Sequence, residues 1–266
     1  MKLPLNPFKA ALASGQPQFG IWAGFASGYA AEMVASFDYD WMLIDGEHAP
    51  NTLPTLQAQL QAVAPYRSAP VVRAVNSDPA LIKQLLDIGA QTLMIPMVES
   101  AEQARALVQA TRYPPHGIRG VGGGLTRATR WDSVPNYLKT AHEQLCLIVQ
   151  VESRAGVENI EAIAAVDGVD AVFVGPADLS TNLGYYGDAS QPEVQQAIRR
   201  AIDATLAAGK VSGILAPQEA DARRYLDWGC QFVAVGIDIS LMRQAALANL
   251  ARYKTLDDQP VASRTY

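Results

Sequence analysis

Eight short apolar runs recur along the chain, and amphipathic segments lie between most of them. The runs are rich in β-branched residues and end at turn-forming residues, a pattern typical of consecutive βα units on a parallel sheet. Because eight such units can close on themselves, the alternation predicts a (β/α)8 TIM barrel. The predicted strands are residues 19–25, 41–45, 71–74, 92–97, 145–152, 169–175, 211–215 and 232–236.

The segment at residues 78–87 has the marks of a complete helix. Asp78 can cap its start, Pro79 suits the first helical turn, and Gly89 can end it. Similar amphipathic segments, predicted as helices, span residues 101–110, 157–165, 192–208 and 219–228.

The chain length of 266 residues fits one barrel of this kind, which often needs about 250 residues. Apolar residues make up 49% and charged residues 18%, as in a well-buried globular protein. No linker or short repeat interrupts the pattern, so we expect a single domain over residues 1–266, with a tail at 257–266 that frays. The long connection at residues 112–144 is predicted to be functional or disordered.

Charge and composition disfavour several classes of partner. The net charge is −5 and no basic block occurs, so nucleic acid is not an expected partner. No apolar run reaches the length of a membrane span, and the first residues do not resemble a secretory signal. We therefore expect a soluble cytoplasmic protein in which Cys146 and Cys230, both within apolar runs, are buried reduced thiols.

Polar residues gather where several predicted strands end. They are Asp45, Gly46, Glu47 and His48 after the second strand, Arg73 after the third, Gln150 and Glu152 at the fifth, and Gly175, Pro176, Ala177 and Asp178 after the sixth. Catalytic groups of TIM barrels come from the C-terminal ends of strands. These side chains are therefore predicted to share one pocket.

Glu152 and Asp178 are candidate metal ligands. Two carboxylates without a neighbouring Cys or His suit Mg²⁺ or Mn²⁺, with water and substrate as further ligands. The alternative is structural: Glu152 would pair with Arg154, and Asp178 would cap a helix before Leu179.

His48 is the candidate general base, because it follows Asp45 on a turn and Asp45 could orient its ring. His116 and His142 are interpreted as structural or surface residues. Arg73 lies in an apolar run and needs a negative partner. That partner could be an anionic substrate, or a salt bridge to Asp45 or Glu47.

The glycine-rich stretch at residues 117–124 lacks the spacing of a nucleotide-binding loop. It could form a carboxylate-binding turn, to which Arg119 would add charge, or a hinge. Lysines such as Lys83, Lys139 and Lys210 lie on predicted helices or loops, which disfavours Schiff-base chemistry. No organic cofactor is expected.

Several motifs together resemble the HpcH/HpaI family of metal-dependent (class II) aldolases, typified by 4-hydroxy-2-oxoheptane-1,7-dioate aldolase. They occur in family order over residues 7–253, and they are LIDGEHAP (43–50), PVVR (70–73), IPMV (95–98), RYPP (112–115), GIRGVG (117–122), QVE (150–152) and VGPADLS (174–180).

The resemblance implies a single barrel of the phosphoenolpyruvate/pyruvate type. It implies that Glu152 and Asp178 bind Mg²⁺, Mn²⁺ or Co²⁺, that His48 and Arg73 are catalytic, and that Asp45 supports His48. The further residues that it places at the substrate are Gln150, Gly175, Pro176, Ala177, Trp22, Leu215, Val121 and Gly122. It also implies a hexamer, a trimer of dimers, in which a C-terminal helix near residues 240–253 is exchanged between subunits.

The activity implied is reversible retro-aldol cleavage of 4-hydroxy-2-oxo acids, through a pyruvate enolate. The 1,7-dioate would give pyruvate and succinic semialdehyde. Oxaloacetate decarboxylation or another pyruvate-enolate lyase reaction could use the same site. A lyase or carboxylase of the wider barrel group should show a phosphate-binding set that is not found here, and a 2-oxo acid binding protein without activity would not need His48.

Overall fold

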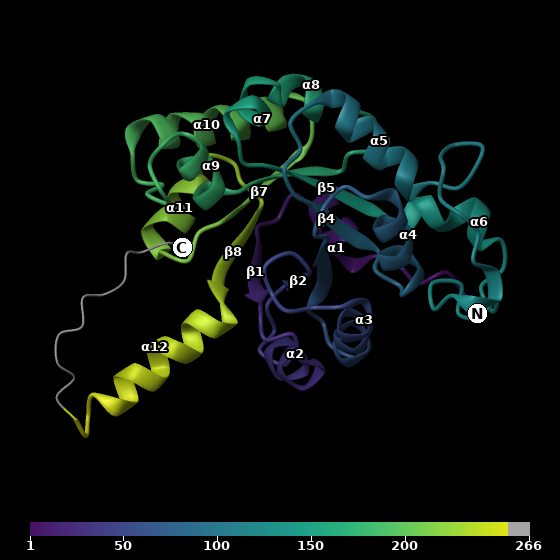
Figure 1. The fold of residues 1–266 in the computed structure, drawn as a ribbon, viewed down its shortest axis with the longest axis horizontal. Coiled ribbons are helices and arrows are strands. Elements are labelled where there is room, and N and C mark those ends of the chain that lie inside the picture. Colours follow the sequence, from purple (N-terminus) through teal and green to yellow (C-terminus); the bar gives the residue numbers. More distant parts are fainter. Residues whose placement is uncertain (255–266) are drawn as a thin grey trace.

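The computed structural model describes residues 1–254 and contains a closed barrel of eight parallel strands (Figure 1). Each strand pairs with its neighbours in chain order, and β8 pairs with β1 to close the sheet. The predicted (β/α)8 barrel is thus confirmed. The strands are β1 (Gln18–Ala23), β2 (Trp41–Asp45), β3 (Ala69–Arg73), β4 (Thr92–Ile95), β5 (Cys146–Val151), β6 (Ala171–Val174), β7 (Val211–Leu215) and β8 (Phe232–Ile237).

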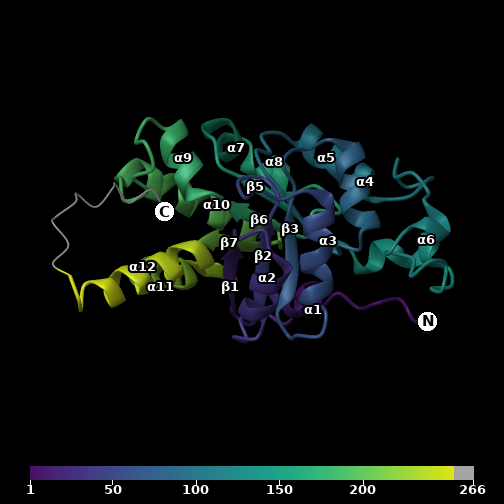
Figure 2. The same ribbon diagram turned by 60° about the horizontal axis from the view of Figure 1, so that its bottom comes forward.

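Helices surround the strands, as both ribbon views show (Figures 1 and 2). The α-helices are α1 (Pro7–Ala13), α2 (Gly28–Ala35), α3 (Leu53–Ala62), α4 (Pro79–Asp87), α5 (Ala101–Thr111), α6 (Tyr137–Thr140), α7 (Arg154–Glu158), α8 (Ile160–Ala164), α9 (Pro176–Asn182), α10 (Pro192–Ala207), α11 (Glu219–Asp227) and α12 (Asp238–Leu250). Two short 3₁₀ helices, η1 (Gly123–Leu125) and η2 (Ala141–Gln144), lie in the long connection between α5 and β5.

The predicted helix at residues 157–165 is wrong as a single element. Asn159 ends α7 and begins α8, with φ −99° and ψ 9°. Its side-chain amide donates to the carbonyl oxygen of Glu99 at 2.8 Å, which ties this interruption to the loop after β4. The helix at α4 was predicted correctly, and the Asp78 side chain caps it by accepting from the backbone N–H of Ala80 at 2.9 Å.

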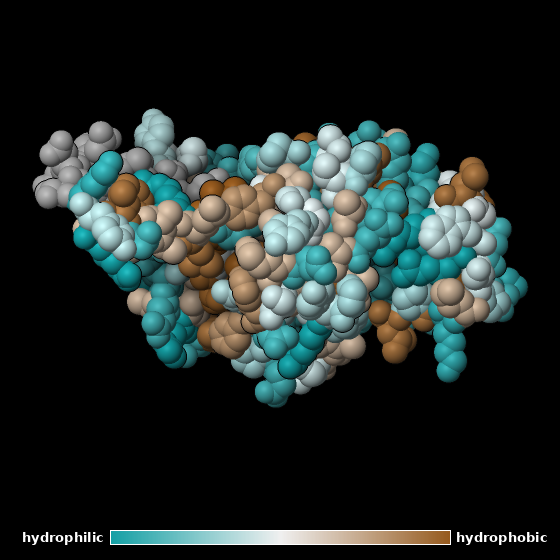
Figure 3. All heavy atoms as spheres, turned by 90° about the horizontal axis from the view of Figure 1, so that it is seen from below, coloured by the Kyte–Doolittle hydropathy of each residue, from teal (hydrophilic) through white to brown (hydrophobic). Residues whose placement is uncertain are grey.

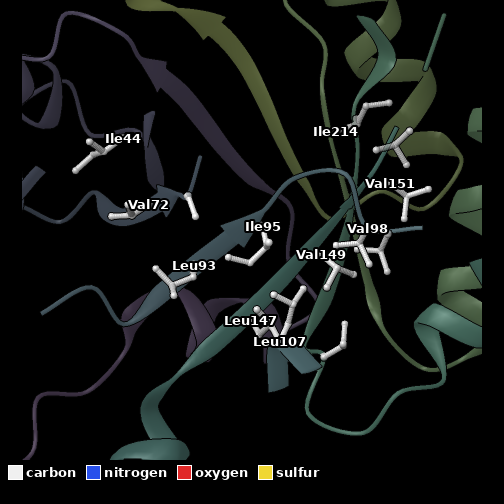
Figure 4. Close-up of a cluster of buried hydrophobic side chains, with 14 of the residues drawn as sticks. Ile44, Val72, Leu93, Ile95, Val98, Leu107, Leu147, Val149, Val151 and Ile214 are labelled. Atoms are coloured by element: carbon white, nitrogen blue, oxygen red, sulfur yellow. The ribbon is translucent and has the colours of Figure 1, made fainter. Parts of the chain in front are cut away.

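The core has two layers because neighbouring residues of each strand point to opposite faces. Leu43 faces the barrel interior with Trp41 and Phe173, whereas Ile44 faces the helices. Figure 4 shows part of this outer layer. Among the residues it labels are Ile44, Val72, Leu93, Ile95, Leu107, Leu147, Val149, Val151 and Ile214.

Helix α1 covers the N-terminal end of the barrel. The Phe8 ring, which is 1% exposed, packs against Trp41 and Phe232 at ring-centroid distances of 5.7 and 5.5 Å. The Asn6 side chain caps α1 and also donates to Thr92 Oγ1 at 2.9 Å. The strands' opposite, C-terminal ends remain available for a site. The two cysteines, Cys146 and Cys230, are buried and free as predicted.

Helix α12 extends away from the barrel in both ribbon views (Figures 1 and 2). Asp238 is its one buried residue, while Ile239, Leu241, Met242, Leu247 and Leu250 are exposed. Figure 3 shows apolar residues on the side of the molecule where α12 lies. Within residues 1–254, no helix combines the length and apolar character that crossing a bilayer requires.

Candidate active site

A cavity of about 350 Å³ lies at the C-terminal ends of the strands. Most of the predicted site residues line it, as the barrel geometry requires. They are Trp22, Asp45, His48, Arg73, Gln150, Gly175, Pro176, Ala177, Asp178 and Leu215. Side chains from five strands and the start of α9 therefore meet in one pocket.

Arg73 is buried in the wall of this cavity and holds two carboxylates. Its Nε and Nη2 atoms donate to the Asp45 carboxylate at 2.9 and 2.6 Å, and its Nη1 atom lies 2.8 Å from Glu47 Oε2. The Trp22 ring packs on the guanidinium at 4.8 Å. Burial alone would raise the pKa of Asp45, but the hydrogen bonds and charge of Arg73 lower it below its ordinary value. The predicted salt bridge exists, and it fixes the orientation of Arg73.

His48 lies at the rim of the cavity, with 58% of its side chain exposed. Asp45 Oδ1 accepts from the backbone N–H groups of Glu47 at 2.9 Å and of His48 at 3.4 Å. Asp45 thus shapes the turn that carries His48. The carboxylate near the His48 ring is that of Glu47, with 3.8 Å between His48 Nε2 and Glu47 Oε2.

Glu152 is buried just past the end of β5; it does not line the cavity itself but lies next to Gln150 and Gly175, which do. Its Oε1 accepts from the backbone N–H of Met97 at 2.9 Å, and its Oε2 accepts from the Gln150 side chain. Burial raises the pKa of Glu152 to about 7; the hydrogen bond from Met97 lowers it, and the charges of Asp178 and Glu47 raise it. Met97 reaches this carboxylate from a left-handed backbone conformation with φ 55°.

Gly175 brings the start of α9 against Glu152. A Cβ atom at position 175 would collide with the Glu152 carboxylate, so the approach requires glycine. Pro176 begins α9 and Asp178 lies in its first turn. Arg154 pairs with Glu193 at 3.1 Å instead of Glu152, and the residue capping α9 is Gly175. The structural alternatives for Glu152 and Asp178 are therefore not what the structure shows.

These residues fit a divalent cation. The charge of Asp178 is one of the causes that raise the pKa of Glu152, and a cation between the two carboxylates would relieve this repulsion. The buried Gln150 Oε1 atom has no hydrogen-bond partner among the described residues. Residues 1–254 contain no cluster of three or more His, Cys, Asp or Glu side chains that could hold a metal. Mg²⁺ commonly binds one or two protein carboxylates and takes further oxygens from substrate and water.

The structure does not bring Val121 and Gly122 to this cavity. They lie in the connection between α5 and β5, where the Val121 side chain is exposed and Gly122 lies near Asp87. Arg119 of the same stretch is buried, pairs with Asp87 at 2.8 Å and stacks on Tyr113 at 4.5 Å. Arg119 therefore has a carboxylate partner within its own chain.

Several contacts were not predicted from the sequence. Glu47 was considered as a partner of Arg73, but its place beside the His48 ring was not foreseen, although it stands next to His48 in the same motif. The backbone of Met97 gave no sequence signal, because a left-handed conformation at methionine is unusual. The outer wall formed by Gln218, Asp221 and Ser240 also carries no motif.

Comparisons with known proteins agree with this geometry. Residues 18–245 match the family model described as HpcH/HpaI aldolase/citrate lyase. A hydroxypyruvate/pyruvate aldolase of Delftia acidovorans is 72% identical, with all of both chains covered. A 4-hydroxy-2-oxo-heptane-1,7-dioate aldolase of Salmonella heidelberg is 55% identical, covering 93% of this chain and 94% of the relative.

A solved HpcH/HpaI aldolase/citrate lyase family protein from Burkholderia cenocepacia superposes with a TM-score of 0.90 at 42% identity, covering 93% of this chain and 98% of that one. The family model and both relatives span most of the barrel and its site. The chain therefore belongs to the HpcH/HpaI aldolase/citrate lyase family and is an aldolase, a carbon–carbon lyase.

Proposed function

We propose that this aldolase is divalent-metal dependent and reversibly cleaves 4-hydroxy-2-oxo acids to pyruvate and an aldehyde. The observation that carries the proposal is the pair of acidic residues Glu152 and Asp178 near the fixed cation Arg73. Asp178 lines the cavity, and Glu152 is buried next to Gln150, which also lines it. The relative at 72% identity is named for both hydroxypyruvate and pyruvate, so we include hydroxypyruvate as a second donor.

Glu152 and Asp178 would hold the cation. When bound there, a divalent ion supplies Lewis-acid polarisation of the keto oxygen of the 2-oxo acid. Gln150 would orient the same oxygen, since its side chain lines the cavity and donates to Glu152. The first-turn N–H groups of α9, at Ala177 and Asp178, have no acceptor within the helix and can bind the substrate carboxylate.

Arg73 stabilises the negative charge that develops as the carbon–carbon bond breaks. Its guanidinium is held in place by Asp45, Glu47 and Trp22 before substrate arrives. A donor fixed in this way does not have to reorganise during the reaction, and such a donor can lower the barrier by about 3 kcal/mol.

His48 accepts the proton of the C4 hydroxyl during cleavage and returns it during condensation. The ring is at the cavity rim, beside the position that the aldehyde half of the substrate must occupy if the 2-oxo acid half lies on the floor. Glu47 lies near the ring and can stabilise the imidazolium that forms.

Proton exchange of pyruvate tests this proposal without knowledge of the aldehyde. In D₂O, the protein with Mg²⁺ or Mn²⁺ should remove the methyl proton signal of pyruvate in the NMR spectrum, and EDTA should stop the exchange. An absence of exchange with Mg²⁺, Mn²⁺ and Co²⁺ would contradict the proposed roles of Glu152, Asp178 and Arg73.

We also propose that α12 packs against another copy of this chain, within a hexamer built as a trimer of dimers. The support is the row of exposed apolar side chains on a helix that leaves its own barrel. Changing Leu241→Ser and Met242→Ser together should yield smaller species by light scattering at matched concentration. Unchanged mass would contradict the assembly role.

A further inference from the structure

The turn at residues 45–51, which carries His48, is held by hydrogen bonds at both of its ends. At the first end, the Asp45 carboxylate accepts from the backbone N–H groups of Glu47 and His48. At the second end, the Asn51 side-chain amide donates to the backbone carbonyl oxygen of Asp45 at 2.7 Å. The two ends of the turn are therefore bound to each other through the Asn51 side chain.

Asn51 also joins this turn to helix α3. Its Oδ1 atom accepts from Thr55 Oγ1 at 2.8 Å and from Gln59 Nε2 at 2.7 Å. Gln59 Nε2 donates further to the backbone carbonyl oxygen of Thr55 at 3.1 Å. Helix α3 is itself fixed, because Leu56 and Leu60 on its inner face are buried in the core. One side chain, that of Asn51, thus attaches the turn to a packed helix.

Gln59 is an unusual residue for its position. It is 1% exposed and lies on the same buried face of α3 as Leu56 and Leu60. A buried amide costs free energy unless its polar atoms are hydrogen-bonded, whereas a leucine fills such a position without that cost. The hydrogen bonds of the Gln59 amide go to Asn51 and to its own helix. Packing alone does not require them, so the contact with Asn51 accounts for a glutamine here.

His48 depends on this turn for its position. Its side chain is 58% exposed, and its Nε2 atom lies 3.8 Å from Glu47 Oε2, which is too long for a hydrogen bond. The ring is therefore placed by the backbone that carries it, and a shift of the turn would move the ring relative to the substrate. A displacement of about 1 Å in a reacting group can lower the rate about 10²-fold.

We propose that Asn51 and Gln59 are positioning residues that hold the His48 ring where it accepts the proton of the C4 hydroxyl. The inference rests on the proposed aldolase function and adds two residues that do not line the cavity. Substitutions in this pair should slow proton transfer at His48 and leave the binding of metal and 2-oxo acid as it was.

Gln59→Leu is the first test, because leucine suits a buried position on a helix. Pyruvate release from 4-hydroxy-2-oxoheptane-1,7-dioate would be measured with Mn²⁺ for the native protein and for the variant. We expect kcat to fall about tenfold, and KM and Mn²⁺ affinity to stay within about threefold. The midpoint of thermal unfolding should be equal or higher. Slower proton transfer should also increase the solvent deuterium isotope effect on kcat, which a loss of folded protein would leave unchanged.

Asn51→Asp tests the other side of the contact. The carboxylate keeps an acceptor for Thr55 and Gln59 but has no N–H to donate to the carbonyl oxygen of Asp45. We expect kcat to fall about 10²-fold, with the same increase in the isotope effect. Gln61→Leu is the matched control, since Gln61 is exposed on the same helix. It should leave kcat and the isotope effect unchanged.

Native values of kcat and of the isotope effect in Gln59→Leu and Asn51→Asp would overturn the inference. A fall in kcat with an unchanged isotope effect, or an equal fall in Gln61→Leu, would show a structural role only and would overturn it as well. If Asn51→Asp does not fold, Gln59→Leu decides alone.

The exchange of pyruvate methyl protons is measured on the native protein with the same metal. If exchange proceeds and the variants behave like the native protein, the proposed function stands and this inference fails. If exchange does not occur, the proposed function fails and the inference fails with it.

Discussion

Arg73 differs from a lysine in ways that its contacts make visible. Its planar guanidinium binds both oxygens of Asp45 and still reaches Glu47, which a single ammonium group cannot do. We expect Arg73→Lys to lower kcat for pyruvate exchange by about 10²–10³-fold, because the stabilising charge would no longer be fixed. Divalent metal affinity, measured by calorimetry, should change by less than about threefold.

Arg67→Lys is the matched control, since Arg67 is exposed and lies 3.9 Å from Asp40 outside the cavity. It should leave both quantities unchanged. A large loss of metal affinity in Arg73→Lys, with kcat preserved, would show that Arg73 acts on the metal site and not on the developing charge.

The raised pKa of Glu152 makes a prediction about the metal-free protein. Its ordinary value is 4.5 and its folded value about 7, so between these the folded state keeps a proton that the unfolded state has lost. The free energy of unfolding should therefore fall as pH rises through this window, by about 2–3 kcal/mol. The measurement is urea unfolding in EDTA from pH 5 to 8, in the native protein and in Glu152→Gln.

The variant should lose most of this pH dependence, although Asp238 and Glu47, whose pKa values are also raised by burial, contribute in the same direction. The pKa of Asp45 is lowered, so its contribution changes only in more acidic solution. An identical pH dependence in both proteins would contradict the raised pKa of Glu152. Metal should then stabilise the native protein more at pH 8 than at pH 6, because a proton competes for Glu152 at lower pH.

At the scale of single residues, the sequence predicts well which side chains lie at the C-terminal ends of strands, but it predicts their contacts poorly. The positions of Arg73 and Asp178 at the cavity could be predicted because each follows an apolar run whose C-terminal end must face the pocket, whereas Glu152 lies behind Gln150 and does not line the cavity. The pairing of Glu47 with the His48 ring could not, because neighbouring turn residues can point in several directions. The hydrogen bond from the Met97 N–H could not be predicted for a related reason, because the backbone angles of one residue decide where this N–H points.

Among the elements, the loop from β6 into α9 has the tightest steric requirement of the site. We expect Gly175→Ala to push the backbone away from Glu152 and Gln150 and to weaken metal binding at least about tenfold, with a stability loss of about 1–3 kcal/mol. Calorimetry with Mn²⁺ and thermal unfolding would measure the two effects.

Gly28→Ala provides a matched control in the first turn of α2. A Cβ there would meet Ala58 atoms at 3.5–3.8 Å, an ordinary contact, so stability should stay equal or rise slightly. If both variants bind Mn²⁺ like the native protein, the close approach at Gly175 is not needed for the site.

Elements with strong periodic patterns were predicted, and those fixed by tertiary contacts were not. The amphipathic pattern and marked ends of α4 allowed its prediction. Helix α1 has seven residues and gains its stability from Phe8 in the barrel, which no local pattern reveals. The break at Asn159 likewise depends on a hydrogen bond to Glu99 in a distant loop.

Across the whole molecule, the two ends of the barrel have separate roles. Phe8 fills the N-terminal end, and the candidate site occupies the other. We expect Phe8→Ala to lower the free energy of unfolding by about 3–5 kcal/mol, as for large buried side chains in general. At a temperature where the variant is folded, kcat should remain within about twofold. A parallel loss of kcat and stability would show that the two ends are coupled.

The barrel as a whole was the most predictable feature, because eight repeated units leave few other ways to bury their apolar faces. The position of the connection at residues 112–144 relative to the cavity was the least predictable feature. Its Val121 and Gly122 were expected at the substrate from the resemblance, but within one chain this connection packs beside α4 and away from the cavity. That expectation stays a prediction.

Because α1 closes one end of the barrel, substrate and products must enter and leave at the other end, which imposes an order on product release. Because Glu152 is buried beside Gln150 and His48 is exposed at the cavity rim, a 2-oxo acid bound near Glu152 would lie deeper than the aldehyde. Cleavage should then release the aldehyde first and pyruvate last. Pyruvate should inhibit cleavage competitively against the hydroxy-oxo acid, while the aldehyde inhibits noncompetitively. The steady-state product-inhibition patterns would therefore show whether the more deeply bound product is the last to leave.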